Sequence, residues 1–209
     1  VVINIDDAAS VTVDPNNLKA VGAGTTGDVT LTNGCTISGT AANMLDALYT
    51  TASKVVLNAS SDLIITDATT GANLSNILAA SNVNDCEIRG TCTIANATTL
   101  TTNSNTLTLG SSGKIINNGT LTNGGTIDFA TSNSGLQAGV ATTIANTVTI
   151  SADTTLDLSD DLTISTAFDV GANTLTISGT GELDGGKITL DDVDSLLKRT
   201  GAGTIASAI

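Results

Sequence analysis

The sequence predicts an all-β fold, a parallel β-helix (solenoid) of about seven coils of about 28 residues. Three observations lead to this fold class: an internal repeat, an alternation of aliphatic residues with Thr, and frequent Asn, Gly and Asp between short β-branched segments. A coil of this kind cannot bury its own interior, so its stability would come from stacking on its neighbours.

The repeat consists of segments such as Thr-Ile-Ser and Thr-Ile-Ala, whose central apolar residue returns with a period of about 28 residues. Side chains alternate between the two faces of a strand, so this residue and the residue two positions before it point the same way. We expect both to point inward. The predicted core column consists of Ile37, Ile65, Ile94, Leu121, Ile150, Ile177 and Ile205.

The residue before each core position is Thr in six of the seven units, and it would point outward. A possible Thr face would then run along the rod through Thr36, Thr93, Thr120, Thr149, Thr176 and Thr204. Regularly spaced hydroxyl and methyl groups can order water, which makes ice binding one alternative function. Thr is also a common residue on exposed strands, so a generic sheet face is the other interpretation.

The chain is expected to form a single domain over residues 1–209, with less regular coils in 1–90 and regular coils in 91–209. Helical spacing of apolar residues predicts short helices over 40–48, with Thr40 as N-cap, and over 71–80. Acidic residues followed by Lys198 and Arg199 suggest a third helix over 191–198.

Composition excludes several classes of function. The chain has no His, so a Ser-His-Asp triad or a His-ligated zinc site is impossible. A net charge of −13 and only three aromatic residues disfavour nucleic-acid binding. No apolar run approaches the roughly 18 residues of a membrane span, so no membrane insertion is expected.

The three cysteines are candidate sites. Cys35 and Cys92 fall two positions before a core residue, which predicts small buried side chains. Cys86 lies six residues before Cys92, so a local disulfide is conceivable, although an odd number of cysteines fits no closed disulfide framework.

Acidic residues form a second group of candidates: Asp6 and Asp7, Asp160 and Asp161, and Asp184 with Asp191, Asp192 and Asp194. Paired carboxylates can act in glycan cleavage, and carboxylates also bind calcium. Turn formation and a solvated acidic surface are the simpler explanation. We therefore predict no enzymatic activity and no cofactor, with calcium as a possible exception.

Two segments carry a resemblance to a known group of proteins. The stretch 11–20 followed by Thr25-Thr26-Gly27, and Ile37-Ser38-Gly39-Thr40-Ala41-Ala42, resembles repeats of large surface and fibre proteins of marine picocyanobacteria and their phages. Thr69-Thr70-Gly71 is a second copy of the first motif, and the remainder resembles adhesin or tail-fibre solenoids. The resemblance implies a structural protein and transfers no catalytic residue.

The expected function is therefore a non-enzymatic structural protein of an extracellular, cell-surface or virion-exposed fibre, appendage or surface layer. Open solenoid ends favour strand addition between subunits, so the expected partner is a second copy or another fibre subunit. Ice binding and adhesion to surface glycans are the alternatives.

Overall fold

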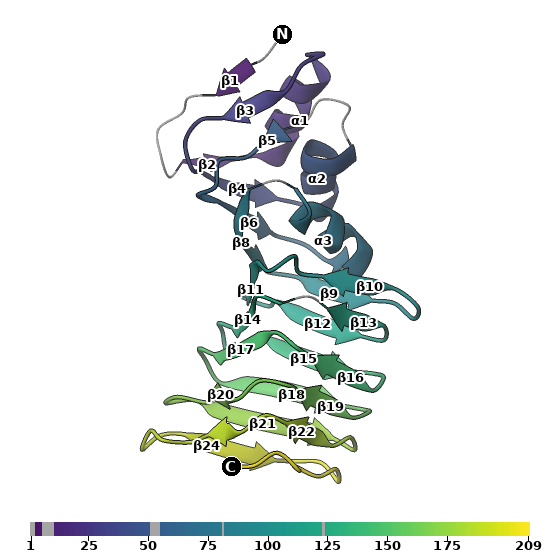
Figure 1. Cartoon of the computed structure of the whole chain (residues 1–209), viewed down its shortest axis with the longest axis vertical. Coiled ribbons are helices and arrows are strands. Elements are labelled where there is room, and N and C mark those ends of the chain that lie inside the picture. The colour runs from purple at the N-terminus through teal and green to yellow at the C-terminus, as the bar shows by residue number, and fades with distance from the viewer. Residues whose placement is uncertain (1–2, 6–10, 51–54, 81, 123) are drawn as a thin grey trace.

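The computed structural model describes residues 3–5, 11–50, 55–80, 82–122 and 124–209 and has the shape of a rod, with stacked strands along its length (Figure 1). Neighbouring strands pair in parallel throughout these residues, which confirms the predicted all-β parallel solenoid. Each coil of the C-terminal part has three short strands separated by corners, and equivalent strands of successive coils stack into three faces.

The first face is a seven-stranded sheet that is continued below β17 by a two-stranded sheet. Its strands are β2 (Thr12–Val13), β4 (Thr36–Gly39), β6 (Ser61–Ile65), β8 (Val83–Ile88), β11 (Thr106–Leu109), β14 (Thr126–Phe129), β17 (Thr147–Ile150), β20 (Phe168–Asp169) and β23 (Ile188–Thr189).

The second face is one seven-stranded sheet: β7 (Thr69–Thr70), β9 (Thr91–Ile94), β12 (Lys114–Asn117), β15 (Gly135–Ala138), β18 (Thr154–Leu158), β21 (Thr174–Gly179) and β24 (Leu196–Arg199). The third face has β10 (Thr99–Thr101), β13 (Thr120–Thr122), β16 (Thr142–Ile144), β19 (Leu162–Ile164) and β22 (Leu183–Gly185). A separate sheet near the N-terminus joins β1 (Ile3–Ile5), β3 (Val29–Leu31) and β5 (Val55–Val56).

The coils of the C-terminal part are shorter than the sequence repeat predicted. Leu107 pairs with Ile127 and Ile115 pairs with Leu136, so one coil takes about 21 residues. Coils near the N-terminus are longer, since Thr12 pairs with Thr36. In a three-faced coil each face with its corner takes about 7 residues. A step of about 28 residues therefore covers one full coil of about 21 residues and one further face, so it ends on the next face of the following coil.

Three helices widen the N-terminal coils: α1 (Pro15–Ala23), α2 (Ala41–Leu45), which continues into the π-helical turn η1 (Asp46–Thr50), and α3 (Gly71–Leu78). The helices predicted over 40–48 and 71–80 are confirmed, including the N-cap, where the Thr40 hydroxyl accepts from the Asn43 N–H at 3.3 Å. They pack against one another, and α3 packs on β10 at the top of the third face.

Helix α1 was not predicted. Its signal is the pair Asp14-Pro15, because an aspartate is a strong N-cap and proline suits the first helical position. The Asp14 carboxylate accepts from the Asn16 N–H at 2.8 Å. Lys19 of α1 donates to Asp46 at the start of η1, and this hydrogen bond holds the pKa of Asp46 below its usual value.

The helix predicted over 191–198 is wrong. Residues 192–195 form a turn, in which the Asp194 N–H donates to the Asp192 carboxylate at 3.0 Å, and the chain then enters strand β24. Leu197 pairs with Leu175 of β21. Stacking on the preceding coil therefore decides the local structure, against the weak helical pattern of the sequence.

One apolar core runs through the rod between the faces. Six predicted core residues, from Ile37 to Ile177, are buried, and Ile205 is half-buried against the same core. Corner asparagines link consecutive coils: the side-chain amides of Asn58, Asn82 and Asn173 donate to backbone carbonyls of the preceding coil at 2.8, 2.8 and 2.9 Å. These bonds satisfy carbonyl groups that the corners would otherwise leave unpaired.

Candidate functional site

The predicted Thr face is wrong, because its six members lie on three different faces. Thr36 and Thr149 belong to β4 and β17 of the first face, whereas Thr93 and Thr176 belong to β9 and β21 of the second. The remaining two, Thr120 and Thr204, lie on the third face, in β13 and beside the bridge between Leu183 and Ile205. The cause is the coil length. The step from Ile37 to Ile65 stays on the first face, where the coils are longer, but every later step of the predicted repeat moves to the next face.

A different set of Thr residues does form an outward column, on the third face. Thr101 pairs with Thr122, and their hydroxyl oxygens are 3.5 Å apart. Thr143 pairs with Thr163 below them, but a shallow groove of about 430 Å³ lies between β13 and β16. The column is therefore two separate pairs, and the ice-binding interpretation loses the long regular array on which it depended.

Aspartates act mainly at the corners between strands. The carboxylates of Asp67, Asp153 and Asp161 accept backbone N–H groups of a neighbouring coil, from Ala41 at 2.7 Å, Thr174 at 2.7 Å and Glu182 at 2.9 Å. Others accept locally: Asp160 from the N–H of Asp161, and Asp184 from that of Gly185. These carboxylates therefore hold corner backbone in place within a coil or between coils, which agrees with the simpler of the two explanations for the acidic residues.

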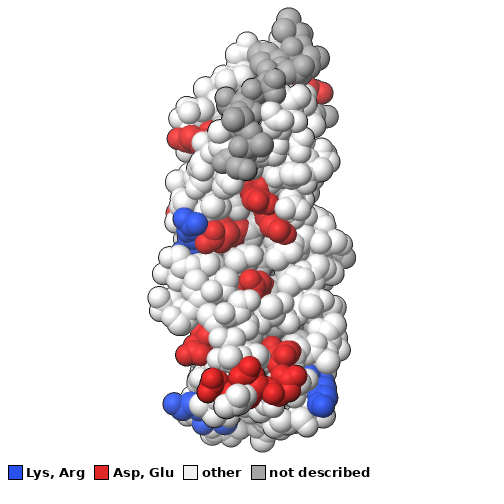
Figure 2. All heavy atoms as spheres, turned by 90° about the vertical axis from the view of Figure 1, so that its left-hand side faces the viewer, with Lys and Arg blue, Asp and Glu red and all other residues white. Residues whose placement is uncertain are grey.

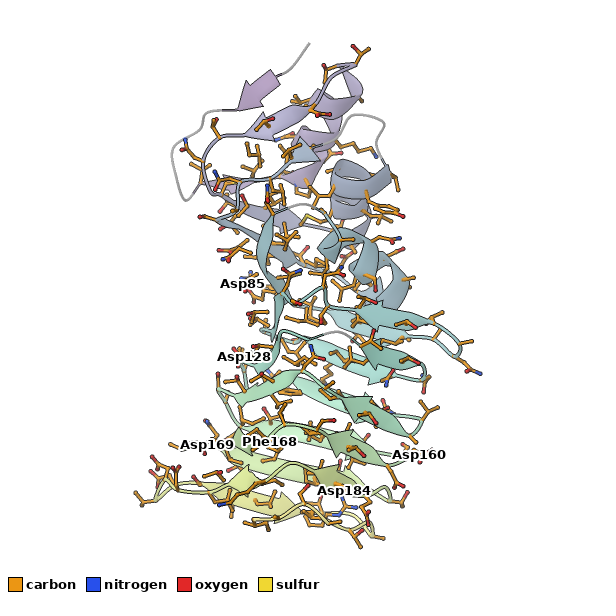
Figure 3. The ribbon with its side chains drawn as sticks, viewed as in Figure 1. Asp85, Asp128, Asp160, Phe168, Asp169 and Asp184 are labelled. Atoms are coloured by element: carbon orange, nitrogen blue, oxygen red, sulfur yellow. The ribbon has the colours of Figure 1, made fainter. Side chains whose placement is uncertain are left out.

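Acidic residues occur at several heights along the rod, as the labelled examples show (Figure 3). Asp85, Asp128 and Asp169 lie at different heights on one side, and Asp160 and Asp184 lie on the other. Among the residues that the structure describes, no group of three Asp, Glu, Cys or His side chains could hold a metal ion. Calcium, the exception that the sequence left open, thus has no carboxylate cluster to bind it in these residues, and Asp6 and Asp7 lie outside them.

All three cysteines are buried, and the conceivable disulfide between Cys86 and Cys92 is not formed. Cys86 of β8 lies between Leu63 and Leu107 on the first face. Cys92 of β9 lies on the second face, where it pairs with Ile115 of β12. Burial raises the pKa of Cys92 to about 12 and the pKa of Cys86 further still. Both groups are thiols at neutral pH, and the thiol form reacts slowly.

We therefore expect Cys86 and Cys92 of the folded protein not to react with a disulfide reagent such as Ellman's reagent at pH 8. Because both pKa values are raised, the reactive thiolate stays scarce until the pH approaches about 12 or the chain unfolds. In denaturant without reductant, all three thiols should react. A count of one thiol per denatured chain would contradict the structure, since it would require a disulfide.

The last coil is the other feature that bears on function. Arg199 of β24 pairs with Ile177 and so occupies an inward position. Its guanidinium donates to the carbonyls of Gly179 and Gly203 at 3.0 Å and of Gly181 at 3.1 Å. The predicted period of about 28 residues did not align Arg199 with Ile177, so its inward position was missed. At the observed coil length the two residues align, and a basic side chain in an inward column would have indicated that it binds backbone carbonyls at a corner.

Below Arg199 the coil is incompletely covered. Leu190, Leu197 and Ile205 are only half-buried against the core, while Val193 is 96 % exposed and Leu196 is 51 % exposed. No described strand pairs with β24 on the side away from β21. Acidic side chains gather near this end, with basic side chains at its rim (Figure 2).

Comparison of the chain with protein-family models, curated proteins and solved structures finds no match to any of them. Within the described residues, none of the helices has the length and apolar character needed to cross a membrane. The functional argument therefore depends on the geometry of the solenoid itself.

Proposed function

We propose that the protein is a non-enzymatic structural segment of an extracellular or virion-exposed fibre, appendage or surface layer. One observation carries the proposal: the apolar core continues to a last coil whose strand β24 has a free edge among the described strands. A rod built from identical stacking contacts can be lengthened by one more coil without a change of geometry. We further propose that a second copy of the chain supplies that coil.

The backbone of β24 supports this stacking. The N–H groups of Leu196 and Thr200 donate to Asn173 and Ile177 at 3.0 and 2.9 Å, towards the preceding coil. Successive residues of a parallel strand bond to opposite sides, so the N–H groups of Leu197 and Arg199 point to the free edge. A free edge with apolar side chains beside it is a template for pairing with another chain.

Sedimentation velocity over a wide range of concentration tests this assembly. The wild-type chain should associate as its concentration rises, and Leu197→Lys should remain monomeric, because an inward-pointing charge at an edge strand opposes pairing. Thr163→Lys adds the same charge on the third face and should associate like the wild type. A wild-type chain that stays monomeric at every concentration, or equal association of both variants, would exclude stacking through β24.

A further inference from the structure

The second face carries a hollow that the structural role does not explain. It has a volume of about 460 Å³ and lies over the neighbouring strands β12, β15 and β18, which stack one below another in Figure 1. Its residues include Lys114, Gly135, Gln137, Thr155 and Asp157. A volume of this size falls within the range of small-molecule sites.

The hollow exists because a glycine interrupts an outward column. Lys114 pairs with Gly135, and Gly135 pairs with Thr155, so one side chain is missing between the lysine and the threonine. A Cβ on Gly135 would lie 2.7 Å from the carbonyl oxygen of Thr155, which is closer than such atoms approach. The backbone itself therefore keeps this position empty, and the hollow is part of the folded scaffold.

The polar groups around the hollow are available to a ligand. In the described part of the chain, the side chains of Lys114, Gln137 and Thr155 form no hydrogen bond or ion pair, whereas Asp157 accepts one hydrogen bond from Ser178 at 3.3 Å. Gln137 is half-buried between Ile116 and Asp157 of the adjoining column. Together they offer an ammonium donor, an amide that both donates and accepts, a hydroxyl and a carboxylate acceptor.

This combination favours a ligand whose own groups both donate and accept. An anion such as sulfate would meet Asp157, and a cation would meet Lys114, so a neutral ligand suits the pair best. Hydroxyl groups are donors and acceptors at once. From the geometry and the charge balance we infer that the hollow binds a segment of a neutral saccharide across β12, β15 and β18.

The site has no aromatic ring on which a sugar could stack, since the second face has none among its described residues. Binding through a few hydrogen bonds at an open surface should be weak, with a Kd of about 1 mM or higher. Stacked copies would repeat the site along a rod, and several weak contacts to one polymer would then act together. The binding itself does not require assembly, so it goes beyond the proposed structural role.

Titration of the isotope-labelled chain, followed by amide chemical shifts, tests the inference. Maltotriose and cellotriose are the neutral saccharide probes, and sodium sulfate and triglycine represent an anion and a peptide. We expect at least one saccharide to produce saturable shifts confined to residues 114–116, 132–137 and 155–157. Absence of saturable shifts with both saccharides, or equal or stronger effects of sulfate or triglycine at these residues, would overturn the assignment.

Two substitutions sharpen the result. Gln137→Met keeps the length of the side chain, and Lys114→Met shortens it by one atom. Both remove the polar group, so each should weaken saccharide binding about threefold to tenfold. Lys198→Met makes the same change in the outward column of the second face, beyond the hollow, and should leave binding unaltered. Unchanged affinity in both hollow variants would refute the site. Leu197→Lys, which blocks stacking, should bind like the wild type and so separates this inference from the assembly proposal.

Discussion

Phe129→Ala is expected to lower the free energy of unfolding by about 3–5 kcal/mol, because it empties the interior of one coil. Phe129 of β14 is only 1 % exposed and has Leu109 and Ile150 as its partners in the coils above and below. Each coil contributes only a few side chains to the core around Phe129, so neighbouring side chains cannot refill the cavity that the substitution leaves. Denaturant unfolding followed by circular dichroism measures the effect.

The matched control is the aromatic residue Tyr49 of η1, which is 56 % exposed. Tyr49→Ala should change the free energy of unfolding by no more than about 0.5 kcal/mol. Contacts in a solenoid join only neighbouring coils, so hydrogen exchange in Phe129→Ala should accelerate first in β11, β14 and β17. A loss below about 1 kcal/mol would mean that the coil is not packed around Phe129.

The fold class could be predicted from sequence because the alternation of Thr with aliphatic residues is the same on every face. The same uniformity made the coil length and the faces ambiguous. Thr149 and Thr176 have almost identical neighbours, yet they lie on the first and second faces. A step of one coil and one face leads to a strand with the same alternation of Thr and aliphatic residues. The composition and the spacing of the repeat therefore cannot distinguish the true coil length of about 21 residues from the longer repeat of about 28 residues.

The site features depend on which residues become neighbours in successive coils, and the wrong period concealed these pairs. Gly135 has no special sequence context, and it becomes informative only beside Lys114 and Thr155. In the sequence, Arg199 is the second residue of a basic pair at the end of a helical pattern. Its inward position becomes evident only when it is aligned with Ile177 of the preceding coil. Asn117 resembles a corner residue, but it is buried and donates to the Thr142 hydroxyl at 2.7 Å.

The second large effect is expected from Gly185→Ala, at the end of β22. Gly185 has a φ of +115°, and a Cβ there would lie 2.1 Å from the carbonyl oxygen of Ile164 in the preceding coil. The conformation and the collision each cost about 1–3 kcal/mol. Relief would require moving β22 away from β19, so we expect a loss of about 3 kcal/mol or more in the free energy of unfolding.

Two other glycines separate the causes of that loss. Gly171 also has a positive φ, +58°, but its nearest Cβ contact would be the Asn173 amide nitrogen at 3.6 Å, so Gly171→Ala should cost only about 1–2 kcal/mol. Gly24 has a φ of −83° and no contact closer than 3.5 Å, so Gly24→Ala should be neutral or stabilise the fold by up to about 1 kcal/mol. If Gly185→Ala costs no more than Gly171→Ala, the close approach of successive coils at this corner is disproved. The predicted order of stability, with Gly24→Ala highest and Gly185→Ala lowest, has two causes. A positive φ separates Gly171→Ala from Gly24→Ala, and the close approach of stacked backbones, which leaves no room for a side chain, separates Gly185→Ala from both.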